Sequence, residues 1–133
     1  MPRDFEQIPG VAPAAIGKVG DEPIFPFPEV LGVIKLCSSN QIAVLGVELF
    51  LAKPDGYNAS GCSDYDLLEN RRWPTVQSAN WPEYVTQNNA LAEECVRRNP
   101  LGDDHVYILT TASWGEFCEI QDMKRRLRRP SHS

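Results

Sequence analysis

The segment from Ile42 to Leu68 constrains the fold of this chain more than any other. Large apolar and β-branched residues run from Ile42 to Leu51 with Glu48 as their only charge, which is typical of a central strand covered on both faces. Lys53-Pro54-Asp55-Gly56 follows, with the proline and aspartate central, as in a type I turn. The polar segment from Tyr57 to Leu67 therefore predicts a return strand and an antiparallel hairpin.

Residues 81–98 form the clearest predicted helix. Asn80 can cap its first amide groups, Glu83 stands three residues on as in a capping box, and Pro100 follows its end. Apolar side chains recur at three-and-four spacing and predict one buried stripe. The stripe consists of Trp81, Tyr84, Val85, Leu91, Ala92, Cys95 and Val96.

Two further helices and a third strand complete the pattern. Residues 29–38 are apolar on most of a helix face, and residues 105–111 have the β-branched and aromatic content of a strand. Ser113 and Glu116 repeat the capping signature ahead of a terminal helix that ends at about Arg128. This order predicts an α+β fold in a single domain, with a small antiparallel or mixed sheet covered by helices.

The chain divides into three predicted regions. Residues 1–28 hold six of the eleven prolines, which forbids a long helix and favours an extended arm that serves as a lid or strap. Residues 29–112 form the α+β core domain, and residues 113–133 form a C-terminal helix with a basic end. A chain of 133 residues is most simply one domain.

Charge is distributed unevenly along the chain. Residues 124–129 hold five of the thirteen basic residues and no acid, so the rest carries eighteen acids and eight bases, a formal charge of −10. An acidic body attracts basic partners and repels nucleic acid, while basic residues in a last helical turn complement the helix dipole. A nucleic-acid-binding accessory protein that uses residues 124–129 is therefore the weaker alternative.

The cysteines and histidines do not predict a metal site. Cys37, Cys62, Cys95 and Cys118 contain no Cys-x-x-Cys pair, and the chain has two histidines. We expect reduced structural thiols and no zinc. His105 follows an acidic turn at a strand entrance, where a histidine is usually exposed.

Known catalytic and membrane signals are also missing from the sequence. It contains no phosphate loop, nucleophile elbow or dinucleotide glycine pattern, so we expect no enzymatic activity and no cofactor. No stretch approaches the roughly 20 apolar residues of a membrane helix, and the first residues do not resemble a signal peptide. A cytoplasmic location is the default expectation.

Candidate functional residues cluster around the hairpin. Glu48 lies within an apolar strand, where a carboxylate is costly unless it is hydrogen-bonded or faces solvent, so a structural or edge-facing role is favoured over a catalytic one. Asp64 and Asp66 point to one side of a regular strand and are best interpreted as surface acids, because two carboxylates alone are a weak cation or acid–base signal. Trp73, in an arginine-containing loop, is a candidate interface anchor.

Several segments together resemble a known family. Val44 to Phe50, Ser63-Asp64-Tyr65-Asp66, the helix bearing Trp81 and Tyr84, and Val106 to Leu109 are similar to the bacterial immunity-protein-forty family. Its members are small α+β proteins associated with polymorphic toxin systems, and the similarity covers about residues 29–112. The resemblance implies that the chain neutralises a cognate toxin by direct protein–protein binding.

We expect that binding to use an acidic surface with one aromatic anchor. Its predicted residues are Glu48, Asp55, Asp64, Asp66, Glu69 and Trp73. The alternative is a small-molecule-binding or metabolic domain, in which the proline-rich arm closes over a pocket lined by Glu48, Tyr65 and Tyr107.

Overall fold

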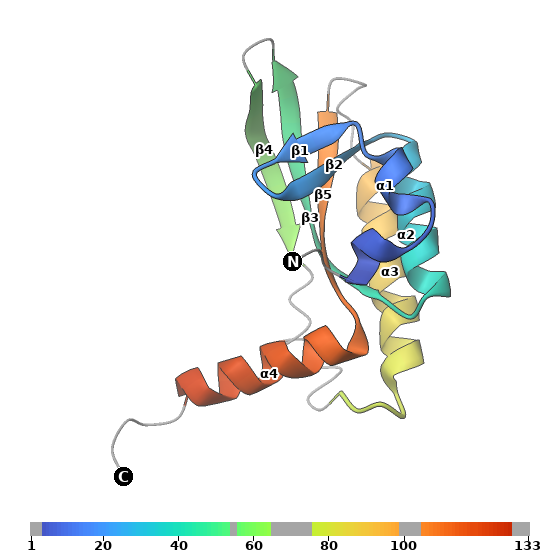
Figure 1. Cartoon of the computed structure of the whole chain (residues 1–133), viewed down its shortest axis with the longest axis vertical. Coiled ribbons are helices and arrows are strands. Elements are labelled where there is room, and N and C mark those ends of the chain that lie inside the picture. The colour runs from blue at the N-terminus through green and yellow to red at the C-terminus, as the bar shows by residue number, and fades with distance from the viewer. Residues whose placement is uncertain (1–3, 54–55, 65–75, 99–104, 129–133) are drawn as a thin grey trace.

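The computed structural model describes residues 4–53, 56–64, 76–98 and 105–128 (Figure 1). Within them, five strands form one sheet in the order β1-β2-β5-β3-β4, and every pair is antiparallel. The predicted α+β class is confirmed. The elements are the 3-10 helix η1 (Asp4–Gln7), α1 (Val11–Ala14), β1 (Gly17–Val19), β2 (Glu22–Pro26), α2 (Glu29–Ser39), β3 (Ala43–Lys53), β4 (Gly56–Asp64), α3 (Trp81–Arg98), β5 (His105–Ala112) and α4 (Trp114–Arg128).

The predicted hairpin is present as β3 and β4. Its ladder runs from the pair Lys53–Gly56 to the pair Gly46–Asp64, with an irregularity between Leu49 and Phe50. On its other side β3 pairs with β5, so β3 lies inside the sheet as its apolar sequence predicts. The middle position of the sheet belongs to β5, which pairs with β2 as well.

Sequence signals at helix ends correspond closely to the observed helices. Helix α3 has the predicted bounds, and α2 extends the predicted helix 29–38 by one residue. The capping box of α4 is also confirmed. The Glu116 amide donates to Ser113 Oγ at 3.3 Å, and the Ser113 amide donates to Glu116 Oε1 at 2.8 Å.

The buried stripe of α3 differs from the prediction. Asn88 and Asn89 are buried in it, whereas Leu91 is exposed and Cys95 is half-buried. The buried positions from Trp81 onward follow the helical repeat more closely than the apolar residues do. A stripe predicted from apolar residues alone therefore omits Asn88 and Asn89, although both lie on the buried face of the helix.

The N-terminal region is built into the sheet, which corrects the expectation of a lid or strap. Its prolines do exclude a long helix, since η1 and α1 have four residues each. However, β1 and β2 form a hairpin around Gly20, whose φ of 62° suits a tight turn, and β2 pairs with β5. This pairing joins residues about 80 positions apart, and no local sequence signal announces it.

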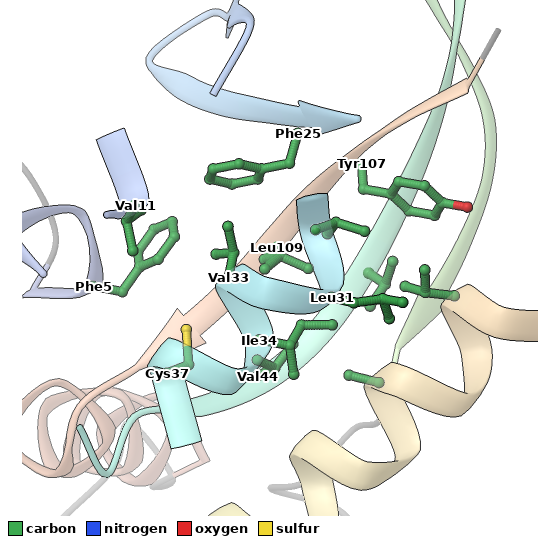
Figure 2. Close-up of a cluster of buried hydrophobic side chains, with 14 of the residues drawn as sticks. Phe5, Val11, Phe25, Leu31, Val33, Ile34, Cys37, Val44, Tyr107 and Leu109 are labelled. Carbon is green, nitrogen blue, oxygen red and sulfur yellow. The ribbon is translucent and has the colours of Figure 1, made fainter. Parts of the chain in front are cut away.

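The main core lies between the sheet and helices α2 and α3. Figure 2 shows Val33, Ile34 and Cys37 of α2 among Tyr107 and Leu109 of β5, with Phe5, Val11 and Phe25 from the N-terminal region. Phe5 and Phe25 meet edge to face, with ring centroids 6.3 Å apart. The N-terminal region thus supplies part of the core that the sequence assigned to residues 29–112.

A second, aromatic cluster joins α3 to α4. The ring centroid of Phe117 lies 5.0 Å from that of Trp81 and 5.2 Å from that of Tyr84. Trp81 is buried and its indole N–H donates to the Gln41 carbonyl at 2.8 Å. The prediction that Trp81 belongs to the buried stripe of its helix is confirmed.

Candidate partner-binding surface

Glu48 lies on the sheet face opposite α2. Its Cα partners are Cys62 on β4 and Ile108 on β5. Ile108 belongs to a small apolar cluster against which Phe50 also packs, whereas the neighbouring Leu49 packs against the main core. Because successive strand residues alternate between faces, these two clusters define the outer and the helix-covered faces of the sheet. Glu48 is half-buried on the outer face.

A second acidic position belongs to the same face. Asp64 is the Cα partner of Gly46, which in turn pairs with Thr110 of β5. Gly46 and Asp64 are each two positions from the Glu48–Cys62 pair, so all of these positions share the outer face. Thr110 is exposed, which shows that the outer face is open to solvent in this row. We call the positions of Glu48, Asp64 and Thr110 the outer acidic row.

The outer acidic row contains only part of the predicted surface. Asp55, Asp66, Glu69 and Trp73 lie outside the described residues. Asp55 precedes Gly56 in the chain, and the other three follow Asp64.

The alternative pocket receives no support from the register. Tyr107 is the partner of Leu49 and is buried in the main core, on the helix-covered face. Glu48 belongs to the opposite face, so these two residues do not line one cavity. The third proposed residue, Tyr65, lies outside the described residues.

His105 is buried, contrary to the expectation that it is exposed. It begins β5 and pairs with Leu51 of β3, while the next residue, Val106, pairs with Pro26 of β2. His105 shares the helix-covered face of the sheet with Tyr107, two residues further on, which explains its burial. Within the described residues its Nδ1 atom has no hydrogen-bond partner.

The sequence interpretation missed a buried polar connection centred on Asn89. Its Oδ1 accepts a hydrogen bond from the Val44 amide at 2.7 Å, and its Nδ2 donates to the Ile42 carbonyl at 3.0 Å and to Ser38 Oγ at 2.8 Å. These bonds fasten α3 to the start of β3 and the end of α2. The available sequence signal was the position of Asn89, because the helical repeat places this polar residue on the buried stripe of α3.

The basic end of the chain lies largely on α4. Arg125 and Arg126 are exposed, and Arg125 pairs with Asp122 at 3.4 Å. Met123 and Leu127, which come before and after these two arginines in the chain, are exposed as well. Arg129 lies outside the described residues.

Cys37 is a buried free thiol, whereas Cys95 and Cys118 are half-buried free thiols. The described residues contain no group of three or more His, Cys, Asp or Glu side chains that could hold a metal ion. Among the described helices, none combines the length and apolar character needed to cross a membrane.

Comparison of the chain with protein-family models, curated proteins and solved structures finds no match. The fold defines the chain as a small α+β domain, and the outer acidic row is the described part of its predicted binding surface.

Proposed function

We propose that this protein neutralises a cognate bacterial toxin by binding it directly, as its resemblance to the immunity-protein-forty family implies. The observation that supports a binding surface most directly is the outer acidic row. It places Glu48 of β3 and Asp64 of the edge strand β4 on the same sheet face as the exposed Thr110 of β5.

The mechanism requires complementary surfaces and no catalysis or cofactor. The residues outside 124–129 carry a formal charge of −10, which accelerates encounter with a basic partner. A basic nuclease toxin fits this charge, because an acidic inhibitor can cover the cleft that binds phosphate. We place the protein in the cytoplasm of the cell that it protects.

Co-expression with the toxin domain encoded beside this chain tests the proposal. We expect the chain to restore survival and to co-purify with the toxin. Failure of both rescue and complex formation would exclude immunity to that toxin.

A matched pair of variants tests the surface. Asp64→Lys with Thr110→Lys changes the charge of the outer acidic row by +3 and should weaken toxin binding by about tenfold or more. Asp21→Lys with Gln87→Lys makes the same change at exposed positions on the β1–β2 turn and α3. Equal binding by the two variants in calorimetry would rule out the outer acidic row as the contact surface.

A further inference from the structure

Helix α4 leaves the body of the protein after its first two turns. Trp114, Phe117 and Ile120 pack against the aromatic cluster. Beyond Gln121 every side chain of α4 that the structure describes is exposed, and Figure 1 shows the helix leading away from the sheet. A helix segment of two turns is marginal in water without packing, so the outer half of α4 is suited to a contact with another molecule.

A stripe of apolar side chains runs from the inner half of α4 into its outer half. Ile120, Met123 and Leu127 recur at spacings of three and four, as core residues of paired helices do. Ile120 is half-buried at the inner end of this stripe, whereas Met123 is 62% exposed and Leu127 is 79% exposed. The stripe therefore extends the core of the protein into solvent.

Charges beside the stripe change sign along the helix. The acidic residues of α4 all come before its basic residues, with Asp122 as the last acid, so the helix is complementary to itself in the reversed direction. Glu119 and Arg126 are seven residues apart and flank the same edge of the stripe, and both are exposed. In an antiparallel pair such positions face each other across the seam, so that Glu119 of one helix lies opposite Arg126 of the other.

We propose that α4 pairs antiparallel with α4 of a second copy of this chain. Ile120 of each copy then packs against Met123 of the other, and Glu119 of each copy meets Arg126 of the other. A nucleic acid fits this helix less well, because Glu119 and Asp122 would approach its phosphates. The contact is small, so the dimer is weak and its population depends on protein concentration.

Sedimentation and light scattering of the full chain over a range of concentrations test this pairing. We expect a monomer–dimer equilibrium that high salt weakens. Leu127→Glu should raise the dissociation constant about tenfold or more, while Leu91→Glu, which changes an exposed leucine on α3, should leave it unchanged. A monomer at every concentration would overturn the proposal.

A charge exchange distinguishes self-pairing from other partners. Glu119→Arg and Arg126→Glu should each weaken the dimer, and the double variant should restore it, because both pairs are then re-formed with reversed signs. A double variant as weak as the single ones overturns the antiparallel arrangement. Circular dichroism and thermal melts check that each variant stays folded, and the substituted side chains are exposed ones outside the Phe117 cluster.

Discussion

Two adjacent asparagines on α3 show how little residue type says about a buried polar group. Asn89 is 2% exposed and satisfies a backbone donor, a backbone acceptor and a hydroxyl. Asn88 is 1% exposed, and neither amide atom has a hydrogen-bond partner within the described residues. A buried polar group stabilises a fold only when its hydrogen bonds are made.

Leucine at each position should therefore have opposite effects on stability. Asn89→Leu removes the side-chain hydrogen bonds to the Val44 amide and the Ile42 carbonyl. It should lower the free energy of unfolding by about 2–4 kcal/mol. Asn88→Leu removes a desolvated amide and should leave stability unchanged or raise it. Urea denaturation of the two variants provides the measurement. Equal losses at both positions would show that Asn88 is as well satisfied as Asn89.

At the scale of elements, the N-terminus of α4 is connected to the start of the chain. Ser113 Oγ donates to Asp4 Oδ2, and the Asp4 amide donates to Glu116 Oε2 at 3.1 Å. Residues of the capping box thus bind both their own helix and η1. The first element described and the last one are held together by this contact.

Ser113→Ala should lower the free energy of unfolding by about 1–2 kcal/mol, because the cap and the bond to Asp4 are lost together. Asp4→Ala should add less in the Ser113→Ala background than in the wild type, since the two residues are bonded. Thermal unfolding of the two single variants and the double variant measures this coupling. Ser78→Ala, at an exposed serine, serves as the control. Additive losses would show that Ser113 and Asp4 act independently.

Elements with strong local signals could be predicted, and those that depend on distant pairing could not. Helix α3 was predicted, with approximate bounds that agree with the observed ones, because Asn80 and Pro100 flank it in the sequence. The strand β2 was not, because its place beside β5 depends on pairing between distant parts of the chain. For the candidate surface, the hairpin turn indicated that β4 pairs with β3. The sheet face on which Glu48 lies could not be predicted, because it depends on the strand register near Gly46.

At the scale of the whole molecule, the N-terminal region contributes side chains to the main core and does not simply lie on its surface. Phe5 is fully buried against Phe25 and lies in the same cluster as residues of α2, β3 and β5. A core divided in this way requires both the N-terminal region and β5 to be in place.

Phe5→Ala should therefore lower the free energy of unfolding by about 3–5 kcal/mol, which is a large fraction of the stability of a small domain. Phe27→Ala removes a ring that is 43% exposed and should cost about 1 kcal/mol or less. Urea denaturation compares the two. Similar losses would place Phe5 outside the cooperative core.

The middle position of β5 in the sheet also affects how the chain is made. The ribosome releases β2 and β3 long before β5, which both strands need as a partner. Until then the nascent chain exposes an apolar strand edge of the kind that associates with other chains. The sheet can therefore close only after β5 has left the ribosome, and a chaperone that shields β3 during translation should improve the yield of folded protein.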